Sequence, residues 1–322
     1  MADHIRKLSW ELGEGGSVSE VIVDFIFNQE KSYHDRFRSV AIWLYFGGQS
    51  VFLQDANSII MKTDDLVDVL SFIKAELPSV ERITSYCRSN TAAKKSMEEM
   101  KRLKEAGLTR IHVGMESGFD PLLKFIKKGV TAADHIEGGR RIVEAGISLC
   151  EYIMPGLGGR RWSREHAEGT ASVVNEINPH FVRLRTLHVA GQSELFDTMK
   201  RGEFEPLGDE DILKEIRVFI EHLDGIETTL VSDHILNLLE ELEGKLPEDK
   251  TRLLATVDRF FSLSDEERLI FRIGRRRGIY KNMNELSDRT VYLRLKGFLD
   301  QYDPGDTKQI ERDLYSIMDH YI

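Results

Sequence analysis

The chain has 322 residues, of which 41% are hydrophobic and 30% are charged, and its formal net charge is −10. This composition supports a large buried core, and the acidic balance disfavours nucleic acid as a partner. No stretch approaches the ~20 uninterrupted apolar residues of a membrane span, and the first residues lack the layout of a secretory signal. We therefore expect a cytoplasmic protein with a small-molecule partner and no membrane contact, and its oligomeric state stays open.

Residues 17 to about 46 have a helical pattern that begins at Ser17 as a cap, breaks near Lys31 and ends at Gly47 and Gly48. The apolar run SVFLQDAN then predicts a strand, and Thr63 caps the helix that follows it. The same order of strand and helix recurs in four more segments, which begin ERITSYC, TRIHVG, ISLCEYI and HFVRLR. Alternating strands and helices predict a parallel sheet wrapped by helices.

Two junctions nearly repeat each other, at the sequences KEAGL and VEAGI. In each, a helix ends on a glycine, Gly107 or Gly146, that can adopt a positive φ, and the next strand begins at once. These glycines fix where two of the predicted strands begin.

Beyond residue 208 the alternation fades, although ETTLVSDH predicts one more strand. Residues 234–322 have the pattern of charged amphipathic helices, and the basic cluster GRRRG at 274–278 indicates a solvated helix end or a partner for acidic side chains. We expect two parts, a barrel-like α/β body over residues 1–207 and a mostly helical extension over residues 208–322 that packs on it.

Polar or glycine residues follow each of the five predicted strands. In parallel α/β sheets the ligand crevice lies at the carboxyl ends of the strands, so these residues are expected at one common edge. The candidate residues at this edge are Asp55, Asn57, Ser85, Tyr86, Arg88, Glu116, Ser117, Met154, Pro155, Gly156, Gly158, Gly159, Arg185, His188 and Gly191.

Single members of this set have structural alternatives. Asp55 and Asn57 can act as turn or cap residues. Glu116 follows a buried strand, so it needs either a salt bridge to Arg88 or Arg185, or a ligand hydroxyl or amine. The glycine-rich run IMPGLGG lets backbone approach a ligand, but it is not a phosphate-binding fingerprint.

Metal and nucleophile chemistry receives little support from the sequence. The two cysteines, Cys87 and Cys150, are far apart, and the histidines form no HExxH or paired spacing. We assign no metal ligand, and Cys87, without an evident base nearby in sequence, is predicted to be unreactive. An ordinary barrel enzyme with Glu116 and His188 as acid and base is a weaker alternative.

The segments VFLQDANSI, ERITSYCRSNTAAKKSMEEMKRLKEAGLTRIHVGMESGFDPLLKFIKKGVT and GISLCEYIMPGLGG, together with SDHILNLLEELEGKLPEDKTRLL, resemble radical S-adenosylmethionine (SAM) proteins. The groups concerned are those related to anaerobic coproporphyrinogen oxidase and biotin synthase. The resemblance runs from about residue 17 to residue 260. It implies a partial (β/α)6 TIM-like barrel that holds a [4Fe-4S] cluster and SAM, with reductive cleavage of SAM to a 5′-deoxyadenosyl radical.

The resemblance also implies roles for the strand-end residues. Asp55 and Asn57 would lie near the methionine amino group, and Ser85 and Arg88 near its carboxylate. Glu116, with Ser117 beside it, would contact SAM or its ribose. Near the adenine the resemblance places Ile153, Pro155 and Gly156, and it assigns Arg185 to the closure of the pocket.

The chain departs from the family in one respect, because it lacks the CxxxCxxC motif whose three thiolates hold the cluster. Met1 is expected to lie just after the cysteine loop of the family, with the first barrel strand missing as well. Two explanations follow: a shortened radical SAM enzyme, or a degenerate relative that kept the barrel as a non-catalytic module for SAM or a nucleotide.

Overall fold

The computed structural model describes residues 1–29, 34–54, 56–299 and 307–318. Within these ranges one sheet contains seven strands that neighbour each other in chain order: β1 (Ser50–Leu53), β2 (Arg82–Cys87), β3 (Leu108–Glu116), β4 (Ser148–Ile153), β5 (Phe181–Leu184), β6 (Thr229–Val231) and β7 (Gly244–Lys245). Strands β1 to β6 are parallel, and β7 runs antiparallel to β6. The predicted α/β fold with a partial (β/α)6 TIM-like barrel is confirmed.

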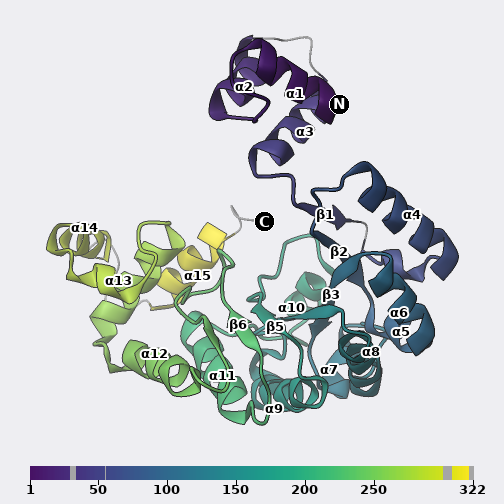
Figure 1. The fold of residues 1–322 in the computed structure, drawn as a ribbon. Coiled ribbons are helices and arrows are strands. Elements are labelled where there is room, and N and C mark those ends of the chain that lie inside the picture. Colours follow the sequence, from purple (N-terminus) through teal and green to yellow (C-terminus); the bar gives the residue numbers. More distant parts are fainter. Residues whose placement is uncertain (30–33, 55, 300–306, 319–322) are drawn as a thin grey trace.

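Helices connect successive strands and follow the outer side of the curved sheet (Figure 1). They are α4 (Thr63–Glu76), α5 (Ser89–Lys94), α6 (Met97–Glu105), α7 (Asp120–Phe125), α8 (Ala132–Glu144), α9 (Gly159–Ile177) and α11 (Asp209–His222). A further short helix, α10 (Glu194–Lys200), lies between β5 and α11 in the chain. Gly107 and Gly146 have φ angles of 115° and 76°, as the repeated junctions predict.

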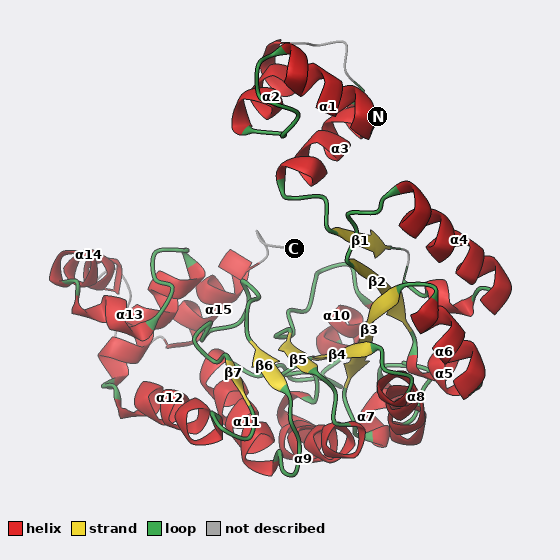
Figure 2. Cartoon of the chain, in the orientation of Figure 1, coloured by secondary structure: helices red, strands yellow, loops and turns green. Residues whose placement is uncertain are grey.

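The first helices form a unit with its own core, apart from the barrel (Figure 2). It consists of α1 (Ala2–Glu11), α2 (Glu20–Asp24), a π-helical turn (Phe25–Gln29) and α3 (Asp35–Tyr45). Its buried cluster contains Ile5, Leu8, Ile22, Ile26, Phe37 and Ala41. The predicted break near Lys31 lies outside the described residues.

Two predicted caps are wrong. The helix expected to begin at Ser17 begins at Glu20 with Ser19 as its cap residue, because the Ser17 hydroxyl donates to the carbonyl of Glu14. Thr63 is the first residue of α4 and not its cap, since its hydroxyl donates to the Glu99 carboxylate at 2.6 Å. A cap residue needs its hydroxyl to accept from a backbone N–H of the helix. The Ser17 hydroxyl is bound instead to a neighbouring backbone carbonyl, and the Thr63 hydroxyl to a distant side chain.

The last part of the chain contains the helices α12 (Lys250–Ser262), α13 (Asp265–Arg276), α14 (Arg289–Leu299) and α15 (Thr307–Met318). One buried cluster runs from the sheet into these helices. None of the described helices has both the length and the apolar composition that crossing a membrane requires. The predicted boundary between residues 207 and 208 stays a prediction.

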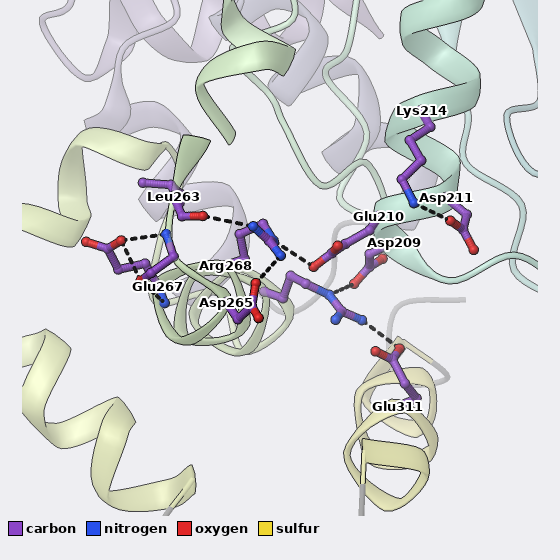
Figure 3. A network of polar contacts seen from close by, with 11 residues as sticks. Asp209, Glu210, Asp211, Lys214, Leu263, Asp265, Glu267, Arg268 and Glu311 are labelled. Carbon is purple, nitrogen blue, oxygen red and sulfur yellow. Dashed lines mark hydrogen bonds and ion pairs between the residues drawn. The ribbon is translucent and has the colours of Figure 1, made fainter. Parts of the chain in front are cut away.

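A buried ion-pair network joins α11, α13 and α15 (Figure 3). Arg272 donates to Asp209 at 3.1 Å and to Glu311 at 2.6 Å, and Arg276 donates to Asp209. Burial raises the pKa of Asp209, but the charges of Arg276 and Arg272 outweigh it and hold that pKa below its usual value. In GRRRG, Arg275 and Arg276 are almost fully buried and have acidic partners, as the second alternative predicts. Arg277, the cap residue at the end of α13, is exposed, as the first alternative predicts.

Candidate functional site

A cavity of about 700 Å³ lies at the carboxyl ends of β2 to β5, where the sequence predicts a ligand crevice. Residues of β2, β3 and β4 and the residue after β5 contribute to its wall, and the loop between α7 and α8 completes it. The lining side chains that carry charge or rings are Tyr86, Arg88, Glu116, Lys128, His135, Tyr152 and Arg185. Five of the predicted residues therefore line the same cavity: Tyr86, Arg88, Glu116, Met154 and Arg185.

Glu116 ends β3 in an unusual backbone conformation. Its φ is 64°, in the left-handed region that residues with a side chain rarely adopt, and the register between β3 and β4 shifts between Gly114 and Glu116. Its carboxylate accepts from the Lys128 ammonium group at 3.2 Å. A Cβ atom at Gly114 would lie 2.7 Å from Oε1 of Glu116, so the glycine leaves room for the carboxylate.

The structural partner of Glu116 is thus Lys128, and the predicted salt bridge to Arg88 or Arg185 is wrong. Sequence separation gives no hint of this pair, because Lys128 follows the short helix α7 at a lysine pair that looks like an ordinary solvated turn. Glu116 and Lys128 are 20% and 28% exposed, so both side chains are accessible from the cavity.

Ser117 points away from the cavity and is fully buried. Its hydroxyl lies 2.8 Å from Nδ1 of His166, whose Nε2 lies 3.1 Å from the carbonyl of Met154. A carbonyl only accepts, so Nε2 carries the proton and Nδ1 accepts from the serine. Burial lowers the pKa of His166 to about 4, which keeps the ring neutral. The pair holds the turns after β3 and β4 against α9.

The glycine-rich turn after β4 is held by a carboxylate that sequence analysis did not select. The backbone N–H of Gly156 donates to Glu215 at 2.6 Å, and the Ser163 hydroxyl donates to the other oxygen of Glu215 at 2.7 Å. Burial raises the pKa of Glu215 to about 7. Ile153 and Pro155 are buried, and neither they nor Gly156 line the cavity, whereas Met154 between them does.

The residues after β1 and β2 form a second tight junction. Asn57 accepts from the backbone N–H of Arg88 and donates to the Thr91 hydroxyl, both at 3.0 Å, so it holds the start of α5. Ser85 is fully buried and donates to the carbonyl of Tyr86. The Arg88 side chain is exposed at the cavity. Asp55 lies outside the described residues.

Arg185 closes one side of the cavity. Its guanidinium donates to Asp233 at 2.9 Å and lies 5.0 Å from the centre of the Tyr152 ring. His188, the other half of the alternative acid–base pair, stacks on Tyr315 of α15 with ring centres 4.4 Å apart and does not line this cavity. The cavity therefore does not bring Glu116 and His188 together.

The cysteines do not fit a [4Fe-4S] cluster. Strand alternation places Cys87 on the face that packs against the helices and Cys150 on the opposite face of the sheet. Both are buried, and burial raises the pKa of each thiol to about 12, which opposes the thiolate form that binds iron. The described part of the chain contains no group of three His, Cys, Asp or Glu residues suited to a metal ion.

A sequence model of the radical SAM superfamily matches residues 19–168. A tRNA uridine(34) acetyltransferase from Methanocaldococcus infernus is 26% identical over 122 residues, which are 38% of this chain and 23% of that protein. The chain thus covers less than a quarter of that relative's length.

Two solved structures are similar at lower identity. Elp3 from Methanocaldococcus infernus with an N-terminal deletion has a TM-score of 0.44 and 18% identity, over 53% of this chain and 44% of that one. Coproporphyrinogen III oxidase (HemN) from Escherichia coli, a radical SAM enzyme, has a TM-score of 0.42 and 12% identity, over 54% and 40%. The matched residues 19–168 include Arg88, Glu116 and Lys128 of the cavity, and the chain therefore contains a radical SAM superfamily domain.

Proposed function

We propose that the cavity at the carboxyl ends of β2 to β5 binds SAM. The observation that carries the proposal is Glu116, which directs a carboxylate paired with Lys128 to the cavity from a left-handed backbone. Such a conformation costs about 1–3 kcal/mol, and conformations of this kind cluster at ligand sites that the surrounding structure holds in place. The strain therefore supports a ligand-binding role for Glu116.

The size and the chemistry of the cavity support the same ligand. Small-molecule sites commonly enclose about 300–1,000 Å³, and this cavity encloses about 700 Å³. Its wall offers a carboxylate for an ammonium group or ribose hydroxyls and a guanidinium at Arg88 for a carboxylate. The rings of Tyr86 and Tyr152 offer apolar surface to a base.

The chain's own residues would bind and orient this ligand. Bound SAM supplies carbon atoms activated by its sulfonium group. Glu116 and Arg88 would hold the methionyl and ribose groups, and the network of Ser117, His166 and Glu215 would keep the two turns behind them fixed. The proposal contains no radical step, because the two cysteines cannot supply the three thiolates of the family's cluster.

Calorimetric titration of the purified chain with SAM tests the proposal. We expect saturable binding, and we expect Glu116→Gln to raise Kd about tenfold, because the variant loses one charge-assisted contact. Glu144→Gln, an exposed change at the end of α8, is the matched control and should leave Kd unchanged. Circular dichroism shows whether each variant is folded.

Three outcomes would contradict the proposal. These are the absence of binding by the folded wild-type chain, an unchanged Kd in Glu116→Gln, and binding of ATP in place of SAM. The last outcome would assign the cavity to a nucleotide, which is the alternative ligand that the resemblance leaves open.

A further inference from the structure

The two faces of the sheet differ in chemistry. Side chains alternate along a strand, and Ile111 and Val113 of β3 and Leu149 of β4 pack into the core beneath the helices. Their sequence neighbours Arg110 and His112 therefore face the inner side of the curve. By the same alternation this inner face contains Phe52, Arg82, Tyr86, Tyr152, Phe181 and Arg183.

Arginines gather on this inner face although the chain as a whole is acidic. Burial is the first cause that lowers the pKa of His112 to about 4. The next causes are positive charges, and in decreasing order they come from Arg183, Arg110, Arg82 and Arg185. Four guanidinium groups from three strands and one strand end thus act on the charge of one histidine.

Carboxylates compensate only part of this charge. Arg183 and Arg185 share Asp233, at 3.2 and 2.9 Å. Arg110 donates to the Ser148 hydroxyl at 3.3 Å and lies 4.3 Å from the centre of the Phe181 ring. The backbone N–H of Arg82 donates to Gln49, but its guanidinium has no ion pair or hydrogen bond with any residue that the structure describes. Arg82 and Arg110 therefore form an uncompensated pair, and such a pair attracts anions.

Aromatic rings lie beside the arginines in one row. Ring centres are 4.8 Å apart between Phe52 and Tyr86, 5.9 Å between Tyr86 and His112, and 5.4 Å between His112 and Tyr152. Tyr86 and Tyr152 also line the cavity at the strand ends, so the row is continuous with it. A flat ring placed on this row would lie next to a ligand of the cavity.

We propose that this inner face binds a flat aromatic molecule with two or more anionic groups, carboxylate or phosphate, held by Arg82 and Arg110 while its ring lies on Tyr86, His112 and Tyr152. The inference rests on the proposed function, because this molecule would be the substrate held beside SAM. Guanidinium groups bind both kinds of anion through paired N–H donors, so the arginines themselves leave the choice between carboxylate and phosphate to experiment.

Titration with benzene-1,3,5-tricarboxylate tests the inference in the presence of saturating SAM. We expect Kd below about 1 mM, and a rise of about tenfold in each of Arg82→Gln and Arg110→Gln. Arg82→Gln keeps the test valid if Arg110→Gln does not fold, because Arg82 is exposed at the start of β2. Arg164→Gln removes an exposed guanidinium on α9 and should leave Kd unchanged.

Two further probes separate the contributions. Cyclohexane-1,3,5-tricarboxylate has the same charges without the flat ring, and we expect it to bind at least several-fold more weakly. A comparison with benzene-1,3-diyl bis(phosphate), which has two phosphate groups on a flat ring, shows whether carboxylate or phosphate is preferred, and tighter binding of either supports the inference. Absent binding of both flat probes, equal binding of the two tricarboxylates, or unchanged Kd in both arginine variants would overturn it.

The same titrations keep this inference apart from the proposed function. SAM binding alone is measured in each arginine variant and is expected to be unchanged. If the protein binds SAM but does not bind the flat anions, this inference alone is contradicted. If it binds the flat anions but does not bind SAM, the proposed function is contradicted and an anion site on the inner face remains.

Discussion

At the scale of single residues, two carboxylates near the cavity have opposite environments. Glu116 pairs with Lys128, whereas Glu151 of β4 is fully buried on the helix-facing side, and neither of its oxygens has a hydrogen-bond partner among the described residues. Burial, and then the charge of Glu116, raise the pKa of Glu151 well above its usual value. Glu151 is therefore neutral in the folded protein at moderate pH, and its ionised form is destabilising.

Replacing Glu151 by Gln should stabilise the protein at high pH. As pH rises above the ordinary pKa of a glutamate, the unfolded chain releases this proton while the folded chain keeps it, so the free energy of unfolding of the wild type falls by about 1.4 kcal/mol for each pH unit. The fall ends at the raised folded pKa. Urea unfolding should show that Glu151→Gln gains at least about 1 kcal/mol over wild type at pH 8 and little at pH 5.

The control for Glu151→Gln is Glu105→Gln, an exposed change on α6 that should have the same small effect at both pH values. An equal gain of Glu151→Gln at pH 5 and pH 8 would show that Glu151 ionises normally in the folded protein. A loss at pH 8 would indicate a partner for its carboxylate.

At the scale of elements, Asp209 connects α11 to the helices at the end of the chain, α13 and α15. It is 7% exposed and binds Arg272 and Arg276 of α13, and Arg272 also binds Glu311 of α15. The sequence GRRRG contributes the buried Arg276 to this network, whereas Arg277 is exposed at the end of α13. One carboxylate therefore neutralises charges from a helix far along the chain.

Asp209→Asn should strongly destabilise the protein, because it leaves two buried guanidinium groups without a full counter-charge. Removal of one partner from a buried ion pair typically costs about 3–5 kcal/mol, and we expect a loss of that order in urea unfolding at pH 7. The folded pKa of Asp209 is depressed, so its contribution is present above the pKa of the unfolded chain and is lost as pH falls towards the folded value.

Asp265→Asn provides the comparison on α13, the helix that carries the two arginine partners of Asp209. Asp265 pairs with Arg268 but is 96% exposed, so its removal should cost less than about 1 kcal/mol. A similar loss in both variants would mean that burial of the Asp209 network does not control its strength.

At the scale of the whole molecule, the barrel and the C-terminal helices α12 to α15 share one hydrophobic core, while α1 to α3 have another. The two cysteines are buried on opposite faces of the sheet. Cys87 lies in the wall of the cavity at the strand ends, and Cys150 does not. The cavity therefore has one of the two cysteines in its wall, whereas the family's [4Fe-4S] cluster requires three thiolates.

Anaerobic reconstitution of the chain with iron and sulfide should therefore leave it without a [4Fe-4S] cluster, because three thiolates are required. Iron analysis after desalting and visible absorption measure the outcome. The double variant Cys87→Ser, Cys150→Ser should retain the same residual iron as wild type. A stoichiometric cluster in wild type that the double variant loses would contradict this expectation.

Much of the fold was predictable because its determinants are local. Apolar periodicity and the turns at Gly107 and Gly146 specify where strands and helices begin and end, and parallel pairing then places the strand ends at one edge. That reasoning placed Arg88, Glu116 and Arg185 at the wall of one cavity. The order of elements and the edge that carries the cavity were therefore determined by the sequence itself.

Only the tertiary structure decided which partner each polar group has. Three such partners are 12 to 59 positions away along the chain: Lys128 for Glu116, His166 for Ser117 and Glu215 for Gly156. The sequence context of these partners does not distinguish them from solvated residues. The inner face with its arginines likewise appears only when the strands are in register, because each strand contributes one or two of its members. Local pattern fixes elements and the packing of distant elements fixes contacts, so the sequence alone determined the barrel and its ligand edge, and the tertiary structure decided the charge and the chemistry of the surfaces that meet there.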